Sequence, residues 1–278
     1  MKLKALLRFT VYEAIRRGTL LLYFIVGILI IGAFAIWLGH RPNDPSVLVI
    51  FGKEIPANIN GISSADFLLL MLFRQSTFWI IVLGTLGVAG LMTSFLEKGT
   101  VELYLSKPLD RWELFLGRAL GASLGVAANV FFCTFGLWLV FGIKAAVWHA
   151  GFLEAGLLVA YAFVCYYSIV AFIGVWSRSA IMSIVFGLFF SFTSIGLEAR
   201  EKGLYHIWDN VVYHRILDLL YYLTPQLDGM LTNAGRLIGT MPFGQEQAPF
   251  TVIPFVWSLA SAILFYGLSI YYFSRQDF

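Results

Sequence analysis

The sequence predicts an all-α membrane protein that crosses the bilayer six times. Two observations support this class, the composition and the distribution of charge. Hydrophobic residues make up 59% of the 278 residues, charged residues only 13%, and the mean hydropathy is +0.81. A soluble domain has roughly 25% charged residues. No soluble core of this size could bury so much apolar surface.

Six long runs without charged residues locate the helices. A helix needs about 20 apolar residues to cross the hydrocarbon region. We therefore expect one transmembrane domain, 1–278, with spans at about 18–39, 75–96, 119–143, 155–177, 179–197 and 252–273. The first run is too long for a signal peptide and lacks a small-residue cleavage site, so we interpret it as a permanent helix.

Basic residues set the expected orientation. With the N-terminus in the cytoplasm, the short inner segments hold eleven of the 19 Lys and Arg residues, namely Lys2, Lys4, Arg8, Arg16, Arg17, Lys98, Lys107, Arg111, Arg118, Arg178 and Arg275. The much longer outer segments hold the rest. Because inner loops are enriched in Lys and Arg, we expect both termini on the cytoplasmic side of the inner membrane.

Two segments outside the spans also have helical patterns, one before the first span and one after the fifth. Residues 2–17 predict an amphipathic helix at the inner leaflet, with basic side chains toward anionic lipid; the alternative is an anchor with no further role. Apolar residues at helical spacing on both sides of Pro225 predict an external helical hairpin between spans five and six. Its polar residues His206, Asp209, His214 and Asp218 are either metal ligands or, more commonly for such residues, a solvated face.

The inner loop at 97–118 predicts a rigid element. A short helix over 100–106 must end before Pro108, because the residue before a proline disfavours helical geometry. A second helix begins at Asp110, which has the spacing of a capping box with Glu113 and continues into the third span. Such an element suits docking to a partner; the alternative is a capped loop that binds nothing.

Small and hydroxylated residues mark two further sets of positions. The glycines predicted to allow close helix packing are Gly84, Gly87, Gly90, Gly117, Gly121 and Gly125. The hydroxyls that could line a polar path on the fifth span are Ser183, Ser191, Thr193 and Ser194. The alternative for the hydroxyls is hydrogen bonding to carbonyls of their own helix.

Several function classes are excluded by what the sequence lacks. No predicted span carries an ionisable residue in its middle, as ion-coupled transporters and proton pumps do. No GxxxxGK[ST] phosphate-binding loop and no catalytic constellation is present. If this chain moves a substrate, another chain must therefore supply the energy.

Four segments together resemble ABC-2-type transporter permeases. Residues 97–111, EKGTVELYLSKPLDR, are similar to the family signature, roughly ExGTxExLLSxP followed by a hydrophobic residue, Ser and Arg. The other segments are EAIRR at 13–17, LTP at 223–225 and YFSRQD at 272–277. The chain departs from the signature at Asp110, where Ser is usual, but Asp preserves the expected cap.

The resemblance implies a half-transporter of two permease subunits, as a homodimer or a related heterodimer, with two separate ATPase subunits. ATP and Mg²⁺ would bind the ATPase, so no cofactor, metal or catalytic residue is expected on this chain. The first, second and fifth spans would surround the path. Residues implied to contact the ATPase are Glu13, Arg16, Arg17, Glu97, Gly99, Thr100, Val101, Glu102, Leu103, Tyr104, Asp110 and Arg111.

Within the superfamily, the chain looks nearest to the branch containing the permease that serves nitrous-oxide reductase maturation, a copper-processing transporter. The partners expected are the ATPase, a second permease subunit and membrane lipid, with no nucleic acid. The alternative from another class is a membrane scaffold or assembly factor without transport activity. An intramembrane enzyme is disfavoured by the missing catalytic constellation.

Overall fold

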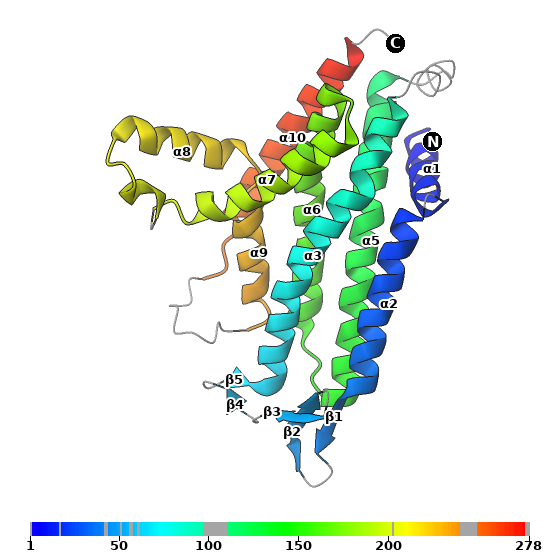
Figure 1. Cartoon of the computed structure of the whole chain (residues 1–278), viewed down its shortest axis with the longest axis vertical. Helices are drawn as coiled ribbons and strands as arrows, with labels where there is room; N and C mark the ends of the chain where they lie inside the picture. Colours follow the sequence, from blue (N-terminus) through cyan, green and yellow to red (C-terminus); the bar gives the residue numbers. More distant parts are fainter. Residues whose placement is uncertain are drawn as a thin grey trace.

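The computed structural model shows an elongated bundle of helices with a small group of strands at one end (Figure 1). The described residues are 2–16, 18–41, 44–50, 52–55, 58–59, 62–96, 110–201, 203–239 and 249–275. Helix α1 and the last turn of α10 lie at the same end, which we call the terminal end (Figure 1). The strands define the opposite end, which we call the strand end.

In the described part of the chain, six helices are long and apolar enough to cross a membrane, which confirms the all-α membrane class. They are α2 (Thr19–Trp37), α3 (Ser64–Phe95), α5 (Arg111–Ala145), α6 (Ala150–Ser177), α7 (Ala180–Glu198) and α10 (Ile253–Ser274). Before them comes α1 (Lys2–Arg16), a helix whose last turn carries Arg16.

Three of these helices begin earlier than the charge-free runs do. Helix α3 continues through Arg74, α5 through Arg118 and α6 through Glu154. A charged residue ends an apolar run, but Arg and Glu are good helix formers and do not end a helix. The runs therefore predict which segments are helical better than they predict where the helices begin.

Five short strands lie in the segment between α2 and α3, to which the sequence assigned no structure. Strands β1 (Leu38–Arg41), β2 (Asp44–Ile50) and β3 (Lys53–Ile55) form an antiparallel sheet in that order. Leu38 pairs with Ile50, and Leu48 pairs with Ile55. Strands β4 (Asn58–Ile59) and β5 (Ile62–Ser63) form a second, two-stranded sheet.

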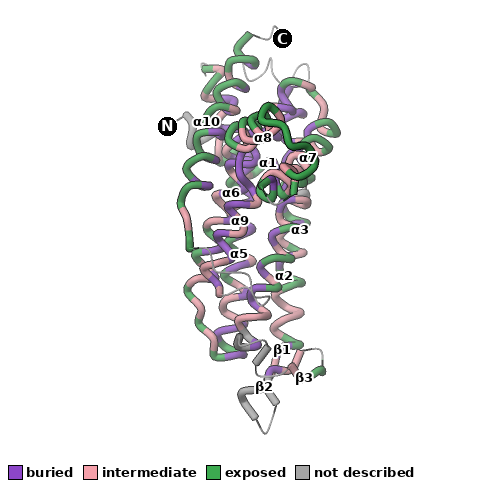
Figure 2. Tube along the Cα trace, turned by 90° about the vertical axis from the view of Figure 1, so that its left-hand side faces the viewer, coloured by how far each residue is buried: buried purple, intermediate pink, exposed green. Residues whose placement is uncertain are grey.

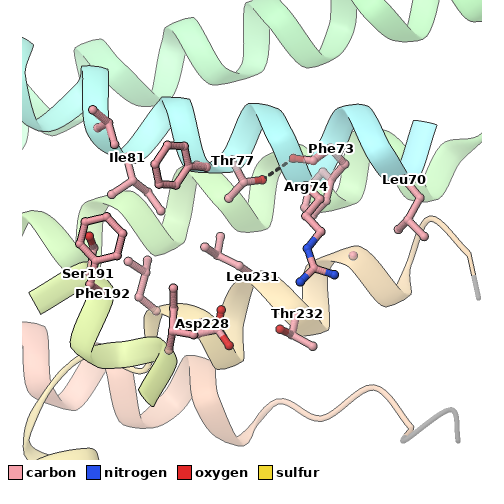
Figure 3. A pocket seen from close by; sticks show the side chains of 15 residues that line it. Leu70, Phe73, Arg74, Thr77, Ile81, Ser191, Phe192, Asp228, Leu231 and Thr232 are labelled. Carbon is pink, nitrogen blue, oxygen red and sulfur yellow. Dashed lines mark hydrogen bonds between the residues drawn. The ribbon is translucent and has the colours of Figure 1, made fainter. Parts of the chain in front are cut away.

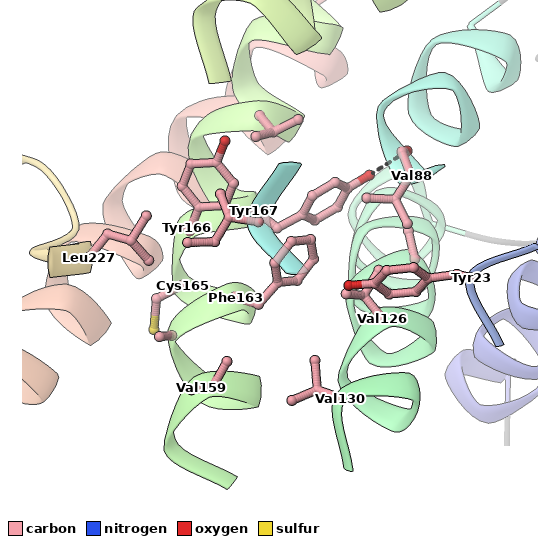
Figure 4. Close-up of a cluster of buried hydrophobic side chains, with 14 of the residues drawn as sticks. Tyr23, Val88, Val126, Val130, Val159, Phe163, Cys165, Tyr166, Tyr167 and Leu227 are labelled. Carbon is pink, nitrogen blue, oxygen red and sulfur yellow. Dashed lines mark hydrogen bonds between the residues drawn. The ribbon is translucent and has the colours of Figure 1, made fainter. Parts of the chain in front are cut away.

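Helix α6 forms the centre of the bundle. In its most apolar window 72% of the residues are buried, compared with 17% in α2 and in α7, which therefore lie at the periphery. Figure 4 shows the aromatic side chains of α6 packed toward α3 and α5. The hydroxyl of Tyr167 donates to the carbonyl of Val88 at 3.2 Å, and that of Tyr166 accepts from Thr85 at 3.2 Å. The buried phenols are thus satisfied by α3.

Helices α8 (Val211–Leu223) and α9 (Leu227–Arg236) follow the short 3₁₀ turn η1 (Leu204–His206). Both helices were predicted, but they do not stand together as an external hairpin. Helix α9 packs against α3, α6, α7 and α10, whereas α8 points away from the bundle and is mostly exposed (Figures 1 and 2). The turn at 224–226 separates a buried helix from an exposed one.

Helix α9 begins near the middle of the bundle and ends toward the strand end. Its last turn lies at the start of α6, because a Cβ on Gly151 would collide with the carbonyl of Leu237. Leu227, at the other end of α9, lies near Cys165 and Tyr166, about halfway along α6 (Figure 4). Ten helical residues span about 15 Å, half of a hydrocarbon layer about 30 Å thick.

The sequence predicts that no span carries an ionisable residue in its middle, and α9, which is not a span, adds one at the level of the middle of α6. The expectation holds for the spans, but Asp228 lies in the first turn of α9, at the deep end of that helix. Helical spacing predicts this ten-residue helix, but it does not predict that neighbouring helices bury it at this depth.

Candidate functional site

A pocket of about 370 Å³ opens between α3, α7 and α9. Figure 3 shows its side chains converging from these three helices. The apolar lining residues are Leu70, Phe73, Phe78, Ile81, Val82, Phe192, Ile195, Leu227 and Leu231. The polar ones are Arg74, Thr77, Ser191, Asp228 and Thr232, with Gly235 completing the wall. The pocket is therefore an apolar cavity with a few polar groups, as small-molecule sites commonly are.

Two opposite charges face this pocket. Arg74 comes from α3 and Asp228 from α9 (Figure 3). Among the described residues, the Arg74 guanidinium and the Asp228 carboxylate form no ion pair or side-chain hydrogen bond with each other or with a third group. Only the backbone N–H of Asp228 is engaged, and it donates to Ser194 Oγ at 3.1 Å.

The hydroxyls predicted on the fifth span mostly bond to their own helix. Ser183 donates to Ser179 O at 3.0 Å, Ser191 to Leu188 O at 2.7 Å and Thr193 to Phe190 O at 3.0 Å. Ser191 is the member of the set that lines the pocket. Ser194 has a different role, because its oxygen holds the first turn of α9.

The predicted glycines fall into a tightly packed group and an open one. A Cβ on Gly117, Gly121 or Gly125 would lie 2.7 Å from Leu6, Thr10 and Leu20, respectively. This face of α5 therefore receives α1 and the start of α2. A Cβ on Gly84 would lie 2.7 Å from the Phe163 ring of α6, whereas one on Gly87 or Gly90 would meet no atom of the described residues within 4 Å.

A buried ion pair also joins α1 to α5. The Arg118 guanidinium donates to the carboxylate of Glu13, and the Arg118 side chain is only 2% exposed. The guanidinium also lies 5.1 Å from the centre of the Phe95 ring and 5.7 Å from that of Phe9. Glu13, which the resemblance implies contacts an ATPase, is thus occupied within the chain.

Other residues implied at that contact lie at the terminal end. Arg111 Nη1 donates to the carbonyl of Ser274 at 2.8 Å and ties the start of α5 to the end of α10. Asp110 is the N-cap residue of α5 but makes no side-chain capping bond, and Glu113 Oε2 is buried without a hydrogen-bond partner in the described part of the chain. The predicted capping box is therefore not formed.

Of the other residues that the resemblance implies at the ATPase contact, the structure describes one. Arg16 is exposed on α1, with its guanidinium 4.8 Å from the Tyr12 ring centre. The remaining residues lie outside the described part of the chain, as does the helix predicted over 100–106; they are Arg17, Glu97, Gly99, Thr100, Val101, Glu102, Leu103 and Tyr104.

A polar cluster that the sequence did not reveal fastens α8 to the end of α7. Arg200 Nε donates to Asp218 Oδ1 at 2.9 Å, and the Tyr205 hydroxyl donates to the same oxygen at 2.7 Å. The Arg200 guanidinium lies 3.7 Å from the Tyr221 ring centre, and the Tyr221 hydroxyl donates to Glu198 at 2.9 Å. We call these five residues the Arg200 cluster.

The cluster accounts for two of the four residues considered as metal ligands. Asp218 is held by Arg200 and Tyr205, and His214 stacks on the Tyr205 ring with 4.2 Å between centres. Across the described residues, no three His, Cys, Asp or Glu side chains come together in a way that could hold a metal ion.

Loss of the Asp218 charge is expected to release α8. Hydrogen bonds from Tyr205 and then Arg200 lower the pKa of Asp218. A depressed folded-state pKa stabilises the fold above the ordinary Asp range, and that contribution is lost as pH falls through the folded value. A spin label at Leu220 should therefore become more mobile in Asp218→Asn at neutral pH, and in the wild type only in acid. The neighbouring Asp209→Asn is the matched control; equal mobility in both variants would contradict the role of the cluster.

Comparison with known families adds one finding to this geometry. A family model described as "ABC-2 family transporter protein" matches residues 12–278. No curated protein matches the sequence. The match includes all six apolar helices, the pocket and the Arg200 cluster, and it leaves out only the first turns of α1.

Proposed function

Because the chain belongs to the ABC-2 transporter family, we propose that it is the transmembrane subunit of an ATP-driven exporter. Membership of this family, together with the six apolar helices, identifies the chain as a multi-pass transporter subunit. The observation that carries the finer proposal is the family match over 12–278 in a chain without a phosphate-binding loop. Energy would then come from a separate ATPase that binds ATP and Mg²⁺.

The proposed ATPase contact lies at the terminal end of the bundle. The segment 97–109 connects the end of α3 to the start of α5, and both helices are anchored in the core by buried residues. Arg111 also ties α5 to α10. A force that reaches the start of α5 would therefore also reach α10. We propose Glu97, Gly99, Thr100, Val101, Glu102, Leu103, Tyr104 and Asp110 as the contact.

Helix α1 is proposed as a second point of contact. Its exposed Arg16 is available to a partner, while Glu13 holds the helix to Arg118. A partner that moves α1 would move α5 with it. In this proposal the terminal end faces the cytoplasm, as the Lys and Arg distribution predicts.

Two copies of the chain would form the complete path. Helices α2 and α7 are among the least buried spanning helices, and α3, which contacts both of them, presents Gly87 and Gly90 with open space beside them. This is support for a second copy at that face of α3. The narrower resemblance to the nitrous-oxide reductase branch is a separate proposal, which an adjacent reading frame for a copper-processing partner would support.

Co-purification tests the exporter proposal. The chain should associate with an ATPase encoded beside it, and the purified chain alone should hydrolyse no ATP.

Glu102→Arg should weaken the association with the ATPase by about tenfold, because a reversed charge at an interface costs roughly 1.4 kcal/mol or more. Glu54→Arg, which reverses a charge at the strand end, is the matched control. Wild-type association of Glu102→Arg would place the contact elsewhere, and hydrolysis by the chain alone would contradict the proposed division of labour.

A further inference from the structure

We propose that the pocket between α3, α7 and α9 binds an amphiphile whose polar end carries both a positive and a negative charge. That this ligand is cargo rests on the proposed exporter function. That the pocket binds it does not. The family match says nothing about what the chain carries. The ligand class follows from the side chains that line the pocket.

Among the described residues, the two charges of the pocket make no direct ion pair or side-chain hydrogen bond, although Arg74 is near enough to attract Asp228 and the Glu198 carboxylate also lies close to Asp228. Arg74 and Asp228 come from different helices and do not form an ion pair with each other. Arg74 is exposed on the bundle and Asp228 is half-buried. In a membrane both would face apolar surroundings, where a charged group is costly unless it is paired. A bound group that pairs with both side chains would remove this cost at both positions.

The arrangement of the charges favours a zwitterion over a single charge. In Figure 3 the Arg74 guanidinium points toward Thr232, four residues along α9 from Asp228. Four residues correspond to about one helical turn, roughly 5–6 Å. An anionic ligand would satisfy Arg74 but leave Asp228 unpaired beside a like charge, and a cationic ligand would do the reverse. A head group with both charges, a few bonds apart, satisfies both.

The rest of the pocket suits an apolar tail. Ile81 and Phe192 lie at the opposite end from Arg74 in Figure 3. Thr77 and Ser191, the hydroxyls nearest to this end, already donate to Phe73 O at 2.7 Å and Leu188 O at 2.7 Å. These hydroxyls therefore present no free proton to a ligand. Phe78 and Phe192, both on the rim, are exposed to the surroundings of the bundle, which in a membrane are lipid chains.

Photolabelling of the chain in nanodiscs, without any ATPase, tests this proposal. The probes are three single-chain amphiphiles with the same photoreactive tail and different head groups: phosphocholine, phosphoglycerol and trimethylammonium. The phosphocholine probe should label α3 and α7 peptides about tenfold more than the others, a difference of about 1.4 kcal/mol. Only this head group presents a phosphate, which can accept hydrogen bonds from Arg74, together with a cation that attracts the Asp228 carboxylate. A two-chain phosphatidylcholine probe identifies the source: equal labelling indicates a bilayer lipid, and weaker labelling a single-chain amphiphile.

Variants connect the labelling to the two charges. Arg74→Gln and Asp228→Asn should each abolish the head-group preference, and the exchange Arg74→Asp with Asp228→Arg should restore part of it. Lys144→Gln and Glu154→Gln remove exposed charges from the neighbouring helices α5 and α6 and should change nothing. Equal labelling by all three head groups, or an unchanged preference in both pocket variants, would overturn the ligand class. Neither result would affect the exporter proposal, which fails only if no ATPase associates.

Discussion

Replacing Arg118 with glutamine is expected to release α1 from the bundle and to lower the thermal stability of the purified chain substantially. The Arg118 side chain is 2% exposed and that of Glu13 is 18% exposed, so the variant removes a buried positive charge from beside a largely buried carboxylate. Breaking a buried pair in this way costs about 3–5 kcal/mol. The guanidinium also contacts two aromatic rings, Phe9 and Phe95, and each cation–π contact contributes roughly 0.5–2 kcal/mol.

A double variant in which Glu13 and Arg118 are exchanged separates the effect of charge from that of packing. Glu13→Gln alone should destabilise the chain, and Glu13→Arg with Arg118→Glu should recover part of the loss. Arg8→Gln, an exposed cation on the same helix, is the control. The measurements are the melting temperature in detergent and protease cleavage after Arg16. If Arg118→Gln melts like the wild type and protects α1 equally, the pair does not hold the helix.

This ion pair shows why part of the structure was not predictable. Composition and charge-free runs predicted the six spanning helices, because burial in lipid requires long apolar segments. Glu13 and Arg118 are 105 residues apart, and each was interpreted separately, one as an ATPase contact and the other as a basic residue of an inner loop. No local pattern indicates that two charges so far apart will meet.

The pocket was missed for a related reason. Arg74 interrupts an apolar run, which predicts the end of a span, although α3 continues on both sides of it. Asp228 belongs to α9, whose place in the bundle depends on tertiary bonds. Ser258 Oγ accepts from the N–H of Gln226 at 2.9 Å, and Ser194 Oγ accepts from that of Asp228 at 3.1 Å. Hydropathy describes each segment alone and cannot predict such contacts.

Glycine spacing predicted close packing but not the partner. The steps Gly117, Gly121 and Gly125 were expected to pack against another helix, and the structure places α1 and the start of α2 against them. The spacing of Gly84, Gly87 and Gly90 is similar, yet among the described residues Gly84 is the member of the three that lies against a neighbour. Sequence spacing identifies a smooth helix face, whereas the helix that covers it is decided by the fold.

Gly121→Ala is therefore expected to destabilise the chain, whereas Gly87→Ala is expected to leave it unchanged or more stable. A Cβ at position 121 would lie 2.7 Å from the Cβ of Thr10 and 3.2 Å from the carbonyl oxygen of Leu7. Neither atom is the end of a flexible side chain, so α1 itself must move, and overpacking of this kind costs about 1–3 kcal/mol.

The comparison with Gly87→Ala isolates packing from helix propensity. Alanine favours a helix by about 1 kcal/mol over glycine at either position, so this gain cancels between the two variants. A Cβ at position 87 would meet nothing within 4 Å. Unfolding of both variants in increasing dodecyl sulfate should therefore separate them, with Gly121→Ala unfolding first and α1 becoming accessible to protease before the rest of the chain. Coincident unfolding curves would mean that α1 adapts to the extra methyl group and that its contact with α5 is loose, and the Glu13–Arg118 pair would then have to hold α1 without support from the glycine face.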